Sequence, residues 1–398
     1  MRQGIKTILI ALTGLLAAIN AAAQWTPVSV PTKNNLNSIS IIEGTSGWIV
    51  GDKGTMLYLD YGSWLSYPAV TDQNLYSVFL LNSSEGWAVG SKGTILHLED
   101  KKWVNVSSPT HQDLNSVCFS SADNGFAVGN NGTFLYYRNG IWEMAERMTP
   151  GHFYTVTINN NQAYFAGGRE NITIPLMKAD FNSNYRFTKL HNPGYYEITG
   201  LSMPEANLVW AVGKPGIILH NDGAGWEKVE TEEKLPSLTG VYFTSKDNGI
   251  AVGYGGTIMT YTPGGWVKEN PDVSVKLNGT IISGSTYYAV GNSGTLLQLK
   301  LSVPVPDDKE SQYPLKISSY PNPSSDNLNI TIPDKAAGNS VVTVMNSGGK
   351  VVLMKDIGSG SQGRIDQIST AGLSDGLYIV NIISGGQVIG SGKFIVKH

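Results

Sequence analysis

One phrase recurs seven times along this chain of 398 residues, and it constrains the fold more than any other feature. The phrase is an aromatic or apolar residue, then Ala-Val-Gly, two variable residues, Gly-Thr and an apolar pair, and it is degenerate in its fourth copy. A second phrase, Leu-Asn-Ser-Ile at residues 36–39 in its first copy, recurs in phase with it. The glycines that close the Ala-Val-Gly part are Gly51, Gly90, Gly129, Gly167, Gly213, Gly253 and Gly291. Two phrases that recur together at a spacing of roughly 40 residues indicate a repeat architecture.

Each repeat reads as four short strands joined by tight turns, as the second copy illustrates. Its expected strands are residues 77–81, 86–90, 94–98 and 103–106. Gly93 lies in the hairpin between the second and third of them, where a positive φ carries no steric penalty for glycine. Four antiparallel strands per repeat are typical of a β-propeller blade, which buries its faces against neighbouring blades.

The tryptophans that open the fourth strands predict how the ring closes. They are Trp64, Trp103, Trp142, Trp226 and Trp266. Tyr185 or Phe187 is expected to take this place in the fourth repeat. The seventh repeat ends at Leu301 without a fourth strand, whereas Trp25 opens the chain one repeat length before Trp64. We therefore predict an all-β fold in which residues 24–301 form a seven-bladed β-propeller closed by its own N-terminal strand.

Both ends of the chain differ from the repeats. Residues 1–23 have the charged, apolar and small-residue regions of a signal peptide, with cleavage expected between Ala23 and Gln24. No cysteine follows that site, which argues against a lipid anchor, and no other segment reads as a transmembrane span. Residues 302–314 read as a polar, proline-containing linker, and residues 315–398 are expected to form a small immunoglobulin-like β-sandwich.

The repeat phrase resembles a known family. Residues 85–90 (Glu-Gly-Trp-Ala-Val-Gly) followed by residues 93–96 (Gly-Thr-Ile-Leu) are similar to the repeat of the photosystem II assembly factor Ycf48 family, and the likeness covers residues 25–301. The resemblance implies a seven-bladed propeller that acts by binding, without chemistry. Members of that family use an arginine patch to bind partners. The arginines of this propeller are Arg138, Arg147, Arg169 and Arg186.

The C-terminal part resembles a second family, the type A sorting domain of the Bacteroidetes type IX secretion system. The residues that carry the likeness are Tyr320, Pro321, Asn322, Pro323, Gly376, Tyr378, Gly392 and Lys393, with Leu-Asn-Ile at 328–330. The resemblance implies that the type IX secretion machinery carries the chain from the periplasm across the outer membrane. It also implies that a sortase-like protease removes the domain. The expected location is therefore secreted or on the outer cell surface.

The sequence shows no motif of catalysis or metal binding. The net charge is −3 without a basic cluster, which argues against nucleic acid as a partner. The single cysteine, Cys118, lies in an expected strand and reads as a buried small hydrophobe. The histidines lack zinc-site spacing, and the sequence contains no calcium loop, so no cofactor is predicted. Sialidases are propeller enzymes that use an arginine cluster, whereas these arginines all lie within residues 138–186.

The candidate binding surface is the face formed by the loops before the first strands and between the second and third strands. Its candidate residues are Asn35, Asn74, Asp113, His152, Tyr154, Arg169, Glu170, Tyr196, Lys214 and Tyr254. Tyrosines beside amides and mixed charges suit a glycan or a protein surface. The leading hypothesis is therefore a secreted or cell-surface binding protein, not an enzyme, that recognises an extracellular protein or glycan. The alternative is an extracellular glycan hydrolase with a sialidase-like propeller.

Overall fold

The structure, a computed structural model, is built from short β-strands in two compact units, Met1–Ser302 and Val303–His398. It describes residues 24–42, 46–60, 62–146, 151–168, 176–180, 186–231, 233–300, 315–317, 319–331, 340–346, 351–358, 365–384 and 387–398. The expected signal peptide before Gln24, the linker at 302–314, and Tyr185, Arg147, Arg169 and Glu170 lie outside these residues.

The first unit consists of seven four-stranded antiparallel sheets in its described residues, one for each repeat, which we call blades and number in chain order. The first three blades are β2 (Leu36–Ile42), β3 (Ser46–Gly51), β4 (Met56–Asp60) and β5 (Ser63–Ser66); β6 (Leu75–Leu80), β7 (Glu85–Gly90), β8 (Ile95–Glu99) and β9 (Lys102–Asn105); and β10 (Leu114–Ser121), β11 (Asn124–Gly129), β12 (Phe134–Arg138) and β13 (Ile141–Met144). The next three are β14 (His152–Asn159), β15 (Gln162–Gly168), β16 (Met177–Asp180) and β17 (Arg186–Lys189); β18 (Glu197–Glu205), β19 (Leu208–Lys214), β20 (Ile217–Asn221) and β21 (Trp226–Lys228); and β22 (Leu238–Ser245), β23 (Asn248–Gly253), β24 (Ile258–Thr262) and β25 (Gly265–Glu269). The seventh is β26 (Leu277–Ser283), β27 (Thr286–Gly291), β28 (Thr295–Lys300) and β1 (Thr26–Pro27).

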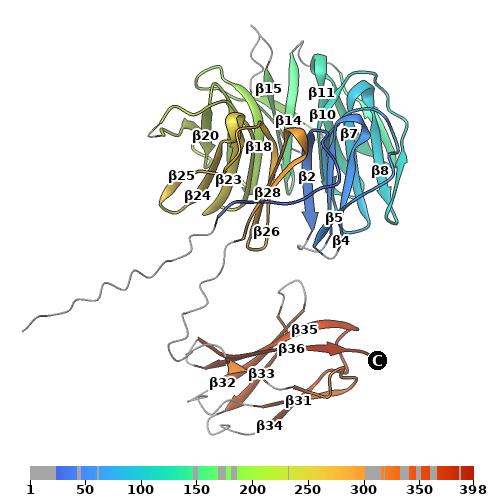
Figure 1. The fold of residues 1–398 in the computed structure, drawn as a ribbon, viewed down its shortest axis with the longest axis vertical. Helices are drawn as coiled ribbons and strands as arrows, with labels where there is room; N and C mark the ends of the chain where they lie inside the picture. The colour runs from blue at the N-terminus through green and yellow to red at the C-terminus, as the bar shows by residue number, and fades with distance from the viewer. Residues whose placement is uncertain are drawn as a thin grey trace, which may run out of the picture. The chain divides into compact units, whose positions relative to one another are not determined.

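The N-terminal strand supplies the fourth strand of the seventh blade. Thr26 of β1 pairs with Gln298 of β28, and the Val28 N–H donates to the Leu296 carbonyl at 2.8 Å. On the inner side, the Asn278 side-chain amide donates to the Leu36 carbonyl at 2.9 Å and so joins the seventh blade to the first. Figure 1 shows the blue first blade beside the orange last one.

Serines on the inner strands of the first three blades tie each of them to the next blade. The Ser38 hydroxyl accepts the Val78 N–H, and the Ser77 hydroxyl accepts the Val117 N–H, both at 3.2 Å. These bonds satisfy backbone donors that would otherwise be orphaned, because an inner strand has no fifth strand to pair with. The second phrase of the repeat is therefore the contact between blades.

The fourth-strand tryptophans fill the space between blades. Trp103 packs edge-on against Trp48 of the preceding blade, with ring centroids 5.4 Å apart. In the fourth blade, Phe187 takes this place and packs edge-on against Phe134 at 5.2 Å. Trp25 is buried in the same way, in a cluster with residues of the sixth and seventh blades.

Between the second and third strands of five blades, the chain makes a one-turn 3-10 helix: η1 (Asp52–Gly54), η2 (Ser91–Gly93), η3 (Asn130–Gly132), η5 (Tyr254–Gly256) and η6 (Asn292–Gly294). Gly93 has φ +73°, which favours glycine, and a Cβ on it would lie 2.0 Å from the Thr110 carbonyl of the next blade. This glycine of the phrase thus permits both a turn and a close approach between blades.

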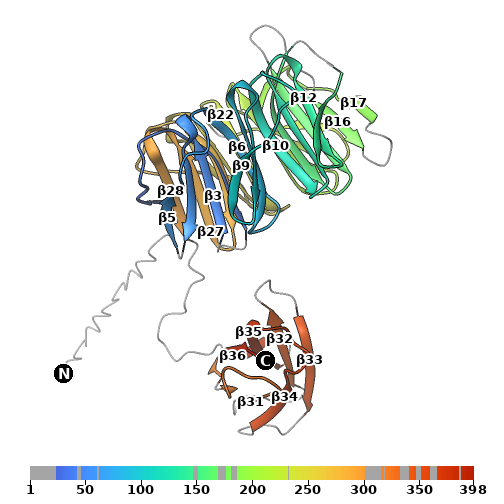
Figure 2. The same ribbon diagram turned by 90° about the vertical axis from the view of Figure 1, so that its right-hand side faces the viewer.

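The second unit is a two-sheet sandwich (Figure 2). Its sheets follow the orders β29-β36-β35-β32-β33 and β30-β31-β34. The strands are β29 (Leu315–Lys316), β30 (Ser319–Tyr320), β31 (Asn327–Thr331), β32 (Ser340–Asn346), β33 (Val351–Gly358), β34 (Ile365–Ser369), β35 (Gly376–Ser384) and β36 (Gln387–Val396). Leu328, Val342, Val380 and Phe394 are fully buried between the sheets.

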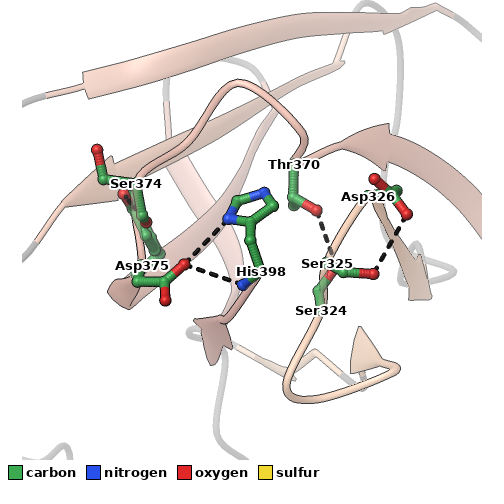
Figure 3. Close-up of polar contacts among 8 residues, drawn as sticks. Ser324, Ser325, Asp326, Thr370, Ser374, Asp375 and His398 are labelled. Carbon is green, nitrogen blue, oxygen red and sulfur yellow. Dashed lines mark hydrogen bonds and ion pairs between the residues drawn. The ribbon is translucent and has the colours of Figure 1, made fainter.

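The opening motif of this unit is bonded to its closing strand. The Asn322 side-chain carbonyl accepts the Ile395 N–H at 2.8 Å, and Ser324 exchanges backbone bonds with Ile395 and Lys397. Figure 3 shows the buried Ser324 hydroxyl bonded to that of Thr370, at 2.8 Å.

Further bonds lie at the same C-terminal end of the closing strand. The Tyr378 hydroxyl donates to the Ser374 carbonyl at 2.8 Å. The Asp375 carboxylate accepts the His398 backbone N–H at 2.9 Å and contacts its ring, and these bonds hold the pKa of Asp375 below its ordinary value (Figure 3). The bonds of the sorting motif thus hold the opening segment of this unit against its C-terminal strand.

Candidate functional site: the mouth of the axial channel

A channel runs along the inner strands of the propeller, and its mouth is a cavity of about 260 Å³. Each inner strand contributes the second residue of its copy of the second phrase to the wall of this mouth. These ring residues are Asn37, Tyr76, Asn115, Tyr154, Thr199, Thr239 and Asn278. Three more residues from the loops around them complete the wall: Lys214, Tyr254 and Lys276.

Five of the ring residues bond to the neighbouring blade. The Asn37 amide donates to the Leu75 carbonyl at 2.9 Å, and the Thr239 hydroxyl donates to the Leu277 carbonyl at 2.6 Å. Equivalent bonds come from Asn115, Thr199 and Asn278. The two exceptions are Tyr76 and Tyr154, whose longer side chains stand in the wall without this bond in the described structure. The repeat position therefore bonds to the next blade in five blades, whereas in the other two it places a tyrosine in the wall of the mouth.

Two tyrosines of the mouth, Tyr76 and Tyr154, are poor acids. Burial raises the pKa of Tyr76, and the Asp113 and Asp52 carboxylates add to the effect. Burial also raises the pKa of Tyr154, with a further contribution from Glu197. These phenols stay protonated at neutral pH, so each can donate a hydrogen bond as well as accept one.

Two lysines give one side of the mouth a positive charge. Lys214 forms an ion pair with Glu197, with Nζ and Oε1 2.7 Å apart. Burial alone would lower the pKa of Lys214, but the hydrogen bond and charge of Glu197 outweigh it, and the pKa is raised. The Lys276 ammonium lies 5.2 Å from the ring centroid of Tyr254, within cation–π range. Among the described residues, no carboxylate forms an ion pair with Lys276.

Four of the sequence-predicted residues hold the turns of the preceding blade. The Asn74 side-chain oxygen accepts the Lys53 N–H at 2.9 Å, and Asp113 does the same for Lys92. Asn35 and His152 make equivalent bonds to Ser293 and Asn131. Each of these four donors has a positive φ, so the bonds fix a turn that needs support. Their acceptor atoms are therefore already engaged.

The remaining predicted residues divide between the mouth and other places. Tyr154, Lys214 and Tyr254 line the mouth together. Tyr196 instead packs against a buried cluster of the fourth and fifth blades, and its backbone bonds to Asn192. Arg169 and Glu170 are outside the described residues.

Sequence reasoning missed most of the ring and Lys276. The signal was present, since all seven ring residues occupy the second position of the second phrase. Because the phrase recurs in phase on the innermost strand of every blade, its second position forms a ring around the channel.

Away from the mouth, the channel holds a cavity of about 600 Å³ whose wall combines serine and threonine hydroxyls with apolar side chains, among them Ile39, Val117 and Cys118. Burial raises the pKa of the Cys118 thiol to about 12. Tyr242 also lines this cavity, and its pKa is raised by burial and by the neighbouring Cys118. The thiol is thus protonated at physiological pH and a poor nucleophile.

We expect Cys118 in the folded protein to react with a thiol reagent at pH 8 on the order of a thousandfold more slowly than in denaturant, because an unfolded cysteine has a pKa near 8.5. Above about pH 8.5 only the unfolded chain releases this proton, so the free energy of unfolding should fall as the pH rises toward 12. Colorimetric thiol titration with and without guanidinium measures the first effect. Equal rates in the two conditions would show that the thiol is neither buried nor protonated as described.

In the described ranges, no three His, Cys, Asp or Glu side chains gather in a way that could hold a metal ion. The helices of those same ranges are too short or too polar to cross a membrane.

The fold and the mouth define the class: a β-propeller with a polar axial pocket, joined to a β-sandwich. Two family models match the chain: "Secretion system C-terminal sorting domain" at residues 318–397 and "Photosynthesis system II assembly factor YCF48" at residues 17–106. The protein is thus a propeller with Ycf48-like repeats that carries a type IX secretion sorting domain. The sorting domain implies export by that system and indicates a secreted or cell-surface protein.

Solved structures support the propeller. YCF48 from Cyanidioschyzon merolae is 18% identical with a TM-score of 0.57, covering 70% of this chain and 99% of that one. YCF48 bound to D1 peptide is 15% identical with a TM-score of 0.59, covering 70% and 97%. A catalytically inactive virginiamycin B lyase from Staphylococcus aureus with quinupristin is 12% identical with a TM-score of 0.61, covering 70% and 99%. At these identities the likeness shows the fold alone. No curated protein matches the sequence.

Proposed function

We propose that this protein is a secreted binding protein whose channel mouth takes an extended, acidic segment of another protein. The observation that carries the proposal is the convergence of Tyr76, Tyr154 and Tyr254 with Lys214 and Lys276 around one cavity. Phenol hydroxyls beside an amide-rich wall suit a peptide backbone, which offers donors and acceptors in alternation.

The charge of the mouth selects the acidic segment. Glu197 already neutralises Lys214, whereas the Lys276 ammonium lies against a tyrosine ring, where a ligand carboxylate can reach it. A charge-assisted hydrogen bond in a partly buried site contributes more than a surface ion pair.

A solved neighbour with the same fold is described as YCF48 bound to D1 peptide, which supports a peptide as the class of ligand. The alternative, a glycan hydrolase, needs carboxylates that converge on the substrate. The part of the mouth wall that the structure describes consists of hydroxyl, amide and ammonium groups, and this composition favours binding.

The test is selection of a random peptide library displayed on phage by the chain from Gln24 to His398. We expect enrichment of acidic peptides, and we expect Lys276→Gln to weaken a selected peptide at least about tenfold by calorimetry. Lys102→Gln, an exposed lysine of the outer strand β9, is the matched control and should change nothing. Selection of neutral peptides, or equal affinity of the Lys276 variant, would refute the proposal.

A further inference from the structure

A second cavity, of about 520 Å³, opens between the first and second blades. Its described lining shares no residue with the mouth. The lining is Ser46, Gly47, Trp48, Tyr58, Leu59, Asp60, Ser66, Tyr67, Pro68, Ser83 and Lys101. A volume of this size falls within the range of small-molecule sites, about 300–1,000 Å³.

The cavity lies where the aromatic packing of the repeats is interrupted. Between the second and third blades, Trp87 is stacked between His97, at 4.0 Å and 15°, and Phe119, at 5.2 Å and 6°. Between the fifth and sixth blades, Trp210 is enclosed by His220, tilted 38° at 4.4 Å, and by the stacked Phe243, at 4.6 Å and 6°.

At the corresponding interface of the first and second blades, Leu80 replaces that phenylalanine. Tyr58 replaces the histidine, and its ring is tilted 40° from Trp48 at 5.8 Å. Trp48 therefore lacks the two-sided stack, and the space beside it is open.

Tyr67 adds a second departure from the repeat. It follows the fourth strand, where Val106, Ala145 and Val229 make the same backbone bond in their blades. The Tyr67 hydroxyl accepts the Trp103 N–H of the next blade at 3.3 Å, which holds the ring across the interface. Its ring is nearly perpendicular to those of Trp48 and Tyr58, at 77° and 90°. The position that holds a small aliphatic side chain in those three blades thus holds an aromatic ring in the first blade, and this ring forms one wall of the cavity.

The rim of the cavity is polar and balanced in charge. It carries the Asp60 carboxylate, the Lys101 ammonium and the hydroxyls of Ser46, Ser66 and Ser83. An organic cation does not suit this site, because the rim already carries the Lys101 ammonium, which would repel it. A purely apolar ligand would leave the rim groups unpaired.

A pyranose ring matches both halves of this lining. One face of the ring presents C–H bonds that pack on an aromatic surface, and its periphery presents hydroxyls that donate and accept hydrogen bonds. We propose that this cavity binds a neutral sugar unit of an extracellular glycan, packed on Tyr58 and Tyr67, with Asp60 and Lys101 bonded to its hydroxyls. The site is independent of the channel mouth.

The test is calorimetry of the chain from Gln24 to His398 with cellotetraose, maltotetraose, mannotetraose and xylotetraose. We expect at least one of them to bind at millimolar concentration or tighter. Tyr67→Val introduces the residue that the second blade has at this position, so the variant should fold, and it should weaken binding at least about tenfold. Asp60→Asn, a change at an exposed side chain, should have a comparable effect.

Lys246→Gln is the control, and it should leave sugar affinity unchanged because Lys246 is exposed and lines neither cavity. No binding of any of the four sugars at millimolar concentration would overturn the inference. The inference would also be overturned if one of these sugars bound and the Tyr67→Val and Asp60→Asn variants both bound it as tightly as the parent chain does. Either result would leave the peptide-binding proposal standing, since that proposal is read out with a different ligand and a different variant.

Discussion

Trp25→Ala is expected to lower the melting temperature of the propeller by about 6–20 °C. Trp25 is 6% exposed and packs in a cluster with Ile250 and Leu277 of two different blades. Truncating a buried tryptophan to alanine costs about 3–5 kcal/mol, and each kcal/mol lowers the melting temperature of a domain somewhat smaller than this one by about 2–4 °C. Thermal unfolding followed by circular dichroism measures the change.

Two further variants separate the role of the N-terminal strand from the burial of one side chain. Trp103→Ala removes an equally buried fourth-strand tryptophan whose strand stays attached by a hairpin. Deleting residues 24–34 removes Trp25 and also leaves the edge of β28 unpaired. The deletion should therefore destabilise the propeller more than Trp103→Ala does. A melting temperature unchanged by the deletion would contradict the role given to this strand.

The sequence predicted the strands and turns of the propeller well, because the same pattern recurs in each repeat and an assignment made in one copy can be compared with the others. A turn inferred at Gly93 from its place between two apolar segments has the positive φ expected of it. The order of the strands also followed from the phase of the two phrases. Local patterns suffice here because the strands that pair within each blade are consecutive in the chain. The exception is the pair formed by β1 and β28.

The sequence predicted the binding residues less well, because loop position does not show which polar atoms are already bonded. Asn74 and Asp113 are polar loop residues at the expected face, but their acceptors are occupied by backbone donors from another blade. Nothing near them in the chain identifies Lys53 or Lys92 as the donor. Tyr67 likewise departs visibly from Val106 at the same place in the repeat, but the sequence does not show the cavity beside it.

Gly90→Ala is expected to destabilise the propeller by about 3 kcal/mol or more, the upper end of the cost of overpacking. Gly90 has extended backbone angles that alanine also adopts, so its conformation is not the reason. The reason is space: a Cβ would lie 2.0 Å from the Asn74 carbonyl oxygen. That oxygen cannot easily withdraw, because it accepts the Ser91 N–H at 2.8 Å.

The same contact recurs at Gly129 and Gly213, where a Cβ would lie 2.0 Å and 1.9 Å from a backbone oxygen. Alanine at either position should therefore cost as much as at Gly90. Gly264→Ala is the matched control, because its Cβ would meet only the Thr262 hydroxyl at 3.7 Å, and it should be nearly neutral. Chemical denaturation gives the free energies of unfolding. If Gly90→Ala is as harmless as Gly264→Ala, the glycine of the repeat is not there to let the backbones approach, and its sevenfold recurrence needs another cause.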